Sequence, residues 1–444
     1  MKLLKFILLL IFIIFPFGQI LRFRLPFFPP SVKFQPLDLA AGMFVSVWFF
    51  VKRNPIKSPW FFKPLATFGL IGIFSLFIKT GVYGFTDMLA AAFYLIRFWI
   101  YTLFGLALYS FLENTDKKNI FKFGLNPPSR KSPIVKLGDS EKLFRFGRIS
   151  ALTKRIIEIP RLSGRVSLKK LLLFEGIIIS IASLLQYFIL PDTRFLYDFG
   201  WDRHFYRSIG TFLDPSFNGL ILVLSFIVWM NLFSQKNKHL YLFVVGGILI
   251  VLAIALCFSR AIYFIFILTV FLFYLKNLSK KFITIIFLVF LFISAIWLSP
   301  KPGGEGVNLL RTSSLFLKID NYSQTIKIIK DNFLFGVGFN AFRIVQKNYG
   351  FIGQRGWEIT NAGGGADNSF LFVFATTGIV GFSVFLYFWI NIFKKSLKEK
   401  NKLVFLSILS ITIASFSFNA VFYPWVLLWL IILLVDQAIS CKLV

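Results

Sequence analysis

Apolar runs of about 20 residues recur along almost the whole chain, and they constrain its fold more than any other feature. A run of this length can cross the hydrocarbon core of a bilayer as a helix, which satisfies its backbone hydrogen bonds within the segment. The sequence therefore predicts an all-α polytopic membrane protein with about twelve transmembrane helices. The predicted spans are residues 6–21, 37–51, 64–79, 87–111, 171–190, 216–233, 240–258, 261–275, 282–299, 368–391, 403–418 and 424–438.

The composition supports this class. Only 15% of the residues are charged, whereas soluble domains average about 25%. The net charge of +30 would suggest nucleic acid as the partner of a soluble protein. Here most Lys and Arg residues lie in short segments between apolar runs, as in cytoplasmic loops. No nucleic acid partner is expected, and membrane lipid and a phosphate-bearing substrate are the expected partners.

The basic segments also predict an orientation. If the N-terminus is cytoplasmic, the even-numbered loops are cytoplasmic, and all five are basic. Both termini are then cytoplasmic. Lys2 and Lys5 precede the first run as in a signal peptide, but no small-residue cleavage site follows, so this run is interpreted as a retained span. The predicted organisation is spans 1–4 in 1–111, a basic cytoplasmic loop at 112–170, spans 5–9 in 171–299, an outer-face loop at 300–367 and spans 10–12 in 368–444.

Two connections are long enough to hold structure outside the bilayer. The cytoplasmic loop contains 141–158, which is either a basic amphipathic helix on the membrane surface or part of a loosely ordered linker. The outer-face loop contains 320–345, where the apolar spacing predicts a helix that ends near Gly336. Long loops of this kind often act as functional lids.

Cysteine and histidine are too scarce to indicate a metal site or a disulfide. Cys257 lies in an apolar run and Cys441 near the C-terminus, and the chain has only His204 and His239. No metal and no cofactor are expected.

Two ionisable residues lie within predicted spans, where charge is costly. Arg97 is at the middle of the fourth span, and Glu175 is near the start of the fifth. Arg97 has two interpretations: a structural pairing within the bundle, with Glu175 as a candidate partner, or a functional role in a water-filled cavity.

Three further polar groups fall on the predicted outer face. Arg207 follows Arg203 in a loop that could also be a salt-bridged turn, Arg260 stands at a span end where it could bind lipid phosphate, and Asp367 precedes a span that it or Asn368 could cap. Two guanidinium groups can clamp a diphosphate, and a nearby carboxylate can accept a proton from an attacking hydroxyl. The pattern predicts transfer of a group from a lipid diphosphate.

The motifs around these residues resemble the O-antigen ligase and polymerase-like membrane proteins, over roughly residues 86–438. The matching segments are RSIGTF at 207–212 with DPS at 214–216, FSR at 258–260, NFLFGVGF at 332–339, DNSFL at 367–371 and TGIVG at 377–381. The resemblance implies a fold of about twelve helices similar to type C glycosyltransferases, in the plasma membrane. It implies a polyprenyl-diphosphate-linked glycan donor, used on the outer face without an essential metal and held by Arg207 and Arg260.

One departure from the family bears on the reaction. Ligases of this family usually have His-Asn where this chain has Asp367-Asn368, and Asp214-Pro215-Ser216 replaces the more usual Asn-Pro-Asn. A carboxylate can still serve as a base, although its ordinary pKa makes it a weaker one. The change argues against transfer to lipid A core and favours a polymerase-like or divergent member.

The resulting hypothesis is a metal-independent membrane glycosyltransferase that polymerises or ligates such a glycan, with a glycan, lipid or protein as acceptor. Its predicted catalytic residues are Asp367, Arg207 and Arg260, and its predicted substrate-binding residues are Arg203, Arg97 and Asn368. A lipid-linked oligosaccharide flippase or another transporter is the alternative, for which Arg97 is the best feature. A non-catalytic scaffold would leave the outer-face motifs unexplained.

Overall fold

Helices occupy every one of the segments for which spans are predicted. The computed structural model describes residues 2–51, 58–113, 167–234, 240–275, 278–300, 306–353 and 365–441. The helices in these segments are α1 (Lys2–Ile14), α2 (Pro36–Val51), α3 (Phe62–Phe77), α4 (Phe85–Glu113), α6 (Leu168–Ile189), α7 (Pro215–Phe233), α8 (Leu240–Ala255), α9 (Arg260–Tyr274), α10 (Leu278–Leu298), α13 (Ser369–Lys398), α14 (Lys402–Ser415) and α15 (Pro424–Ser440). The described residues form isolated β-bridges but no strand.

The lengths and apolar surfaces of these helices identify a membrane-embedded protein. Within the described parts of the chain, α4, α6, α7 and α13 are each long and apolar enough to cross a bilayer, and most of the others are shorter apolar helices. Large apolar side chains also face outward, including Phe50 at 84% exposure and Phe188 at 71%. Exposed apolar surface on this scale is unfavourable in water and favourable in lipid.

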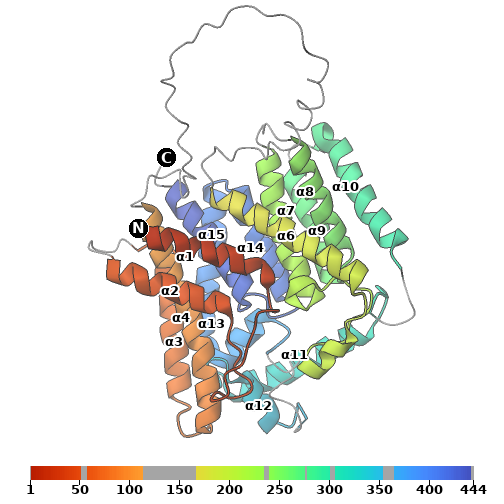
Figure 1. Ribbon diagram of the computed structural model, residues 1–444. Coiled ribbons are helices and arrows are strands. Elements are labelled where there is room, and N and C mark those ends of the chain that lie inside the picture. Colours follow the sequence, from red (N-terminus) through yellow and green to blue (C-terminus); the bar gives the residue numbers. More distant parts are fainter. Residues whose placement is uncertain are drawn as a thin grey trace, which may run out of the picture.

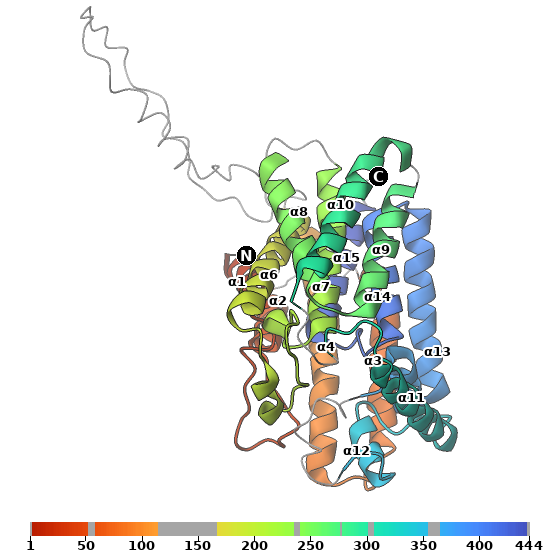
Figure 2. The same ribbon diagram turned by 90° about the vertical axis from the view of Figure 1, so that its right-hand side faces the viewer.

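The bundle has two distinct ends. Both chain termini lie toward the upper end in Figure 1. Two helices that are not predicted spans, α11 (Ser313–Asp331) and α12 (Phe342–Asn348), lie at the opposite end (Figure 2), and α11 runs across the bundle in Figure 1. We call this the α11 end. The loop that precedes α7 and the turn between α3 and α4 lie toward the same end.

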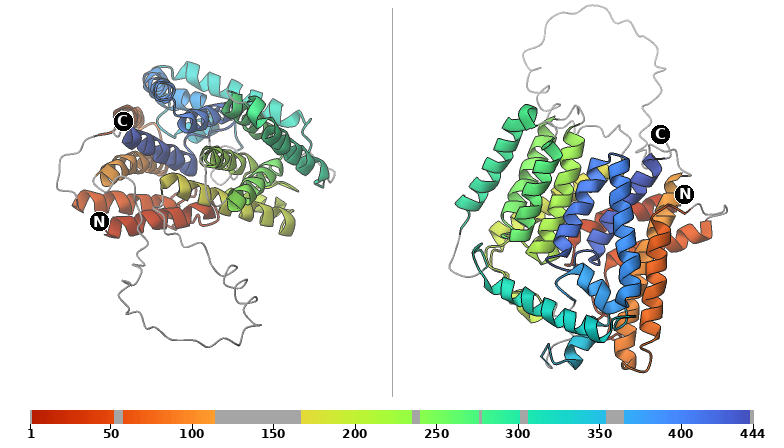
Figure 3. Two further views of the ribbon diagram at one scale, coloured as in Figure 1. Left: turned by 90° about the horizontal axis from the view of Figure 1, so that it is seen from above. Right: turned by 180° about the vertical axis from the view of Figure 1, so that it is seen from behind.

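Helix α7 forms the centre of the bundle, as the view from above in Figure 3 indicates. It packs against α6, α8, α9 and α14, and its side chains are buried on nearly all sides. A helix that is apolar all round is expected in such a position. Its start is fixed by Asp214, whose carboxylate accepts hydrogen bonds from the Ser216 and Phe217 amides, and by Pro215 in its first turn.

The segment predicted as an outer-face loop differs in detail from the prediction. The expected helix begins earlier, at Ser313, and ends at Asp331 rather than near Gly336. It ends there because Asn332 and Gly336 leave helical geometry, Gly336 with a φ of +70°. The helix considered for 141–158 lies outside the described residues.

An interruption in α13 explains why the motif at 332–339 accompanies the one at 377–381. Gly378 has φ +64° and ψ −169°, a conformation confined essentially to glycine. The segment 333–338 lies against this break and takes up the backbone groups that the helix leaves free. The bonds run from Val337 N to Ala375 O (2.9 Å), from Gly338 N to Thr376 O (3.1 Å) and from Ile379 N to Phe333 O (2.9 Å).

Replacing Gly378 by alanine is expected to destabilise the protein by at least about 3 kcal/mol. An L-residue is strained at this φ and ψ, which costs about 1–3 kcal/mol, and a Cβ atom would overlap the Leu334 carbonyl. The thermal midpoint of the detergent-solubilised protein measures the effect. Gly350→Ala is the matched control, since Gly350 has a φ of +73° with open space around it. Equal midpoints for the two variants would contradict the packing role of the break.

Candidate functional site

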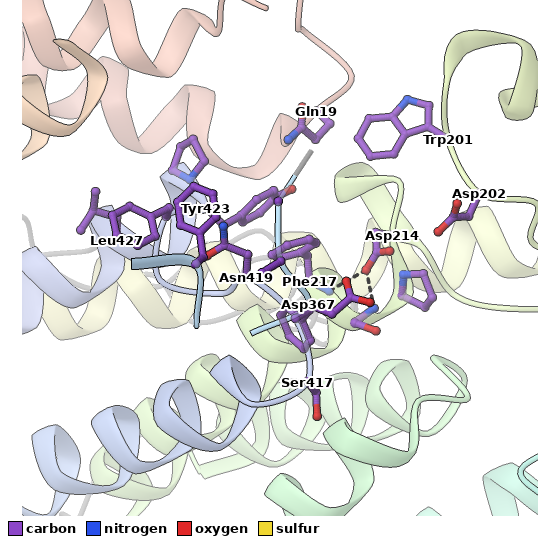
Figure 4. A pocket seen from close by; sticks show the side chains of 18 of the residues that line it. Gln19, Trp201, Asp202, Asp214, Phe217, Asp367, Ser417, Asn419, Tyr423 and Leu427 are labelled. Atoms are coloured by element: carbon purple, nitrogen blue, oxygen red, sulfur yellow. Dashed lines mark hydrogen bonds between the residues drawn. The ribbon is translucent and has the colours of Figure 1, made fainter. Parts of the chain in front are cut away.

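A cavity of about 530 Å³ lies at the α11 end of the bundle. Its walls come from segments far apart in the sequence, among them the chain after α1, the loop before α7, helix α11 and the turn before α15. Figure 4 shows Gln19, Asp214, Asp367 and Tyr423 around this space.

Helix N-termini give the cavity a positive electrostatic character. The first residues of α7, α9 and α15 line it, and Asp367 lies two residues before the start of α13. The unsatisfied amides and the dipole at a helix N-terminus favour an anion. Several cationic side chains also line the cavity: Arg22, Lys33, Arg97, Arg207, Arg260, Arg311, Lys318 and Arg343. The cavity is therefore suited to a group that carries multiple negative charges.

Four of the six predicted site residues line this cavity. Arg207, Arg260, Asp367 and Arg97 are among its lining residues, although more than 100 residues separate Arg260 from Asp367 in the sequence. Arg203 and Asn368 do not line the cavity. Arg203 is exposed and stacks on the Tyr197 ring, with its guanidinium carbon 4.3 Å from the ring centroid.

Asn368 serves as the N-terminal cap of α13. Its side-chain oxygen accepts hydrogen bonds from the amides of Phe370 (2.8 Å) and Leu371 (3.1 Å). Of the two residues considered for this role, Asn368 therefore performs it, and Asp367 is left to face the cavity.

Arg207 is held in a fixed position by the turn between α8 and α9. It is 7% exposed, and its Nε and Nη2 donate to the carbonyls of Cys257 (3.2 Å) and Phe258 (3.1 Å). Phe258 has a φ of +47°, which is unusual for an aromatic residue. Burial and the charge of Arg311 lower the pKa of Arg207 to about 10, so it stays protonated at neutral pH.

Arg260 connects the cavity to α11. Its Nη1 donates to the Arg311 carbonyl at 2.8 Å, and its Nη2 donates to the Ser314 hydroxyl at 2.7 Å. Both partners lie at or just before the start of α11. Arg260 therefore has partners inside the protein, in addition to the lipid phosphate considered from the sequence.

Asp367 is partly buried where α11 crosses the start of α13. Its backbone amide donates to Asn321 Oδ1 at 2.8 Å, and its carbonyl accepts from the Tyr322 hydroxyl at 3.4 Å. Burial raises the pKa of its carboxyl group, the Lys318 ammonium lowers it, and Asp202 and Asp214 raise it further. A raised pKa makes this carboxylate a stronger base than an exposed aspartate.

Asp202, His204 and Asp214 form a second polar group in the cavity. One potential ligand atom from each residue lies within 4.8 Å of the others, which is close enough for a metal ion. Arg207, however, donates toward Nδ1 of His204 at 3.4 Å, and together with Arg311 it opposes a further cation. Burial, Arg207 and Arg311 lower the pKa of His204 to about 3, so this imidazole is neutral. The balance of charge favours an anion beside Arg207 over a metal ion.

Chelation is therefore expected to leave unchanged the glycan transfer that the sequence motifs predict. Product formation by the purified protein would be compared before and after dialysis against EDTA, with Mg²⁺, Mn²⁺ or Zn²⁺ added back. A loss that one of these ions reverses would contradict this expectation and assign the Asp202 group to a metal.

Arg97 forms a buried ion pair, but Asp38 is its partner. Its Nη2 lies 2.7 Å from Asp38 Oδ2 and donates at 2.7 Å to the Lys33 carbonyl, and Asp38 accepts another bond from Tyr101. The pairing considered with Glu175 is therefore wrong. Glu175 is 2% exposed, and its Oε2 has no hydrogen-bond partner among the described residues. Arg97 still lines the cavity, with much of its hydrogen-bonding capacity directed at the bundle.

Breaking the pair of Arg97 and Asp38 is expected to lower the free energy of unfolding. Asp38→Ala should destabilise the protein by about 3–5 kcal/mol, because it leaves the Arg97 charge buried without its carboxylate. The thermal midpoint in detergent is the readout. The double variant Asp38→Leu/Arg97→Leu should recover most of the loss, since an apolar pair needs no desolvation of charge. A double variant as unstable as the single one would contradict the pairing.

Several cavity residues carry no signal of their own in the sequence. Lys318 and Arg311 belong to the outer-face loop, where charged residues are ordinary, and Arg22 lies in the chain after the first span. Asp214 belongs to the DPS motif at 214–216, whereas for His204 proximity to the Arg207 motif was the one signal that could have indicated it.

Neither a protein-family model nor a curated protein sequence matches this chain. The likeness to O-antigen ligases and polymerases therefore depends on the motifs described above.

Proposed function

We propose that this chain is a membrane glycosyltransferase that polymerises or ligates a polyprenyl-diphosphate-linked glycan. The observation that carries the proposal is the convergence of Arg207, Arg260 and Asp367 on one cavity. Two guanidinium groups and a carboxylate are the set required to hold a diphosphate and deprotonate an acceptor hydroxyl. The proposal includes twelve spans, a type C-like fold, cytoplasmic termini and a site on the outer face of the plasma membrane.

In the proposed reaction the acceptor hydroxyl oxygen attacks the anomeric carbon of the donor sugar. Its proton passes to the Asp367 carboxylate. The bond between the anomeric carbon and the diphosphate oxygen breaks, and its electron pair leaves with the polyprenyl diphosphate. Arg207 and Arg260 stabilise the charge that develops on this leaving group, assisted by the helix N-termini around it.

Helix α11 forms one wall of the cavity and is the proposed cover of the site. Arg260 is bound to its start, and Asp367 is bound to its middle through Asn321. Two of the proposed catalytic residues thus contact the same helix. A shift of α11 would move Arg260 and Asp367 together. Movement of the proposed cover is therefore coupled to catalysis.

Polymerisation is the preferred form of the reaction because Asp367 occupies the position where ligases of the family usually have histidine. The acceptor is then the glycan of a second lipid-linked molecule.

Transport of a lipid-linked oligosaccharide is the second candidate. Two observations favour it: α13 is interrupted at Gly378, and the buried pair of Arg97 and Asp38 lies beside the cavity. Broken helices and buried charges are typical of transporters.

Reconstitution into vesicles separates the two functions. The donor is a polyprenyl-diphosphate-linked oligosaccharide placed in one leaflet, and the products are resolved by mass. The proposal expects longer or transferred glycan together with free polyprenyl diphosphate. Movement of intact donor to the other leaflet without a new glycosidic bond would establish transport instead.

A further inference from the structure

A second cavity, a groove of about 790 Å³, lies between the start of α3 and the end of α13. These helix ends lie toward the upper end of the bundle in the right-hand view of Figure 3. Its lining comes from the residues at the start of α3 and from the last turns of α13. None of the residues assigned to the proposed reaction lines it.

The groove continues the interface between these two antiparallel helices. Phe68 and Phe385 are in ring contact there, with centroids 5.5 Å apart, and Ile71 lies beside Gly381. Two turns farther toward the groove, the Lys395 ammonium lies 4.7 Å from the centroid of the Trp60 ring. The two helices are thus tightly packed toward the middle of the bundle. Farther toward their upper ends, polar side chains line the groove between them.

The polar part of the groove is strongly basic. Four lysines line it, Lys63, Lys394, Lys395 and Lys398, with Glu399 as the one acidic residue. Glu399 pairs with Lys395 at 3.6 Å and accepts a hydrogen bond from Gln437. Among the described residues no carboxylate lies within 4.0 Å of the other three lysine ammonium groups. Three positive charges therefore remain for a ligand.

The remaining lining is apolar or aromatic. Val384 and the 60% exposed Tyr387 lie on α13 about two to four turns before the lysines, so an apolar ligand chain could follow this helix toward the middle of the bundle. Trp60 adds an aromatic ring that lines the groove beside Lys395.

We propose that this groove binds one anionic phospholipid. The phosphate lies among Lys63, Lys394 and Lys398, and an acyl chain lies along Tyr387 and Val384. Basic pockets between transmembrane helices are known to select acidic headgroups. The juxtaposed apolar wall favours a lipid over free phosphate. This proposal does not depend on the proposed glycosyltransferase activity.

Native mass spectrometry of the full-length purified protein tests the proposal, with phosphatidylglycerol or phosphatidylcholine added at increasing concentration. We expect one phosphatidylglycerol to be retained in preference to phosphatidylcholine. Each Lys→Gln change in the groove should weaken this binding about five-fold, and K63Q/K394Q/K398Q should remove most of it. Equal retention of the two lipids, or displacement of phosphatidylglycerol by millimolar inorganic phosphate, would overturn the proposal.

Two further variants separate the groove from general attraction to basic residues. K2Q/K5Q/K170Q removes the same charge from helices outside the groove and should keep the bound lipid. T67W keeps all four lysines but fills the groove from the exposed Thr67 position, and it should lose the lipid. Loss in K2Q/K5Q/K170Q, or retention in T67W, would contradict a defined site.

Discussion

Arg207→Ala is expected to lower the proposed glycan transfer by at least about a hundred-fold. The side chain is buried and aimed by two carbonyls of the α8–α9 turn, so its charge is preorganised toward the cavity. Loss of one preorganised group that stabilises developing charge typically costs 10²–10³ in rate. Arg207→Lys should recover little, because an ammonium cannot bind two carbonyls and a diphosphate in the same geometry. Release of polyprenyl diphosphate by the purified protein measures the rate.

Arg194→Ala is the matched control for this experiment. Arg194 belongs to the same loop, but it is exposed, pairs with Asp192 at 2.6 Å and does not line the cavity. It should retain normal transfer. Thermal midpoints of both variants show whether loss of activity reflects loss of folding, since Arg207→Ala also leaves two carbonyls unpaired. A folded Arg207→Ala protein with normal transfer would refute the role of Arg207.

Asp367→Asn is expected to lower transfer by about 10²–10⁴-fold, the usual contribution of a positioned general base. Asparagine keeps the size of the side chain and the backbone bonds to Asn321 and Tyr322, but it cannot accept the proton. Asp320→Asn is the control, because Asp320 is an exposed α11 residue that does not line the cavity. Similar rates for both variants would exclude Asp367 as the base.

The pH dependence gives a second readout of the same residue. Asp367 must be ionised to act as a base, so transfer declines as the pH falls through its pKa. Burial, Asp202 and Asp214 raise this pKa, which places the decline at higher pH than for an exposed aspartate. Lys318 lowers it, so Lys318→Gln should move the decline to still higher pH. Coinciding profiles of wild type and Lys318→Gln would contradict this assignment.

Local sequence signals were sufficient to locate the helices and to group the main residues of the cavity. Asn368, one of the two residues considered as a cap, starts α13, and apolar runs locate the other helices. Arg207, Arg260 and Asp367 could be grouped because the predicted alternation of spans puts their loops on one face.

Contacts between distant segments could not be predicted in this way. Arg97 pairs with Asp38, 59 residues away, rather than with Glu175, because helix neighbours and not span depth decide the partner. The packing of the 333–338 segment against Gly378 could not be predicted either, since glycine has several possible roles in a span. His204 was judged only as a metal ligand, whereas the structure places it against Arg207.

An experimental structure with a non-transferable phosphonate analogue of the polyprenyl-diphosphate-linked donor would test the central claim most directly. The account expects the two phosphorus atoms between the guanidinium groups of Arg207 and Arg260, with the anomeric carbon facing Asp367. An analogue bound elsewhere in the bundle, with neither arginine within hydrogen-bonding distance of its phosphate oxygens, would contradict it.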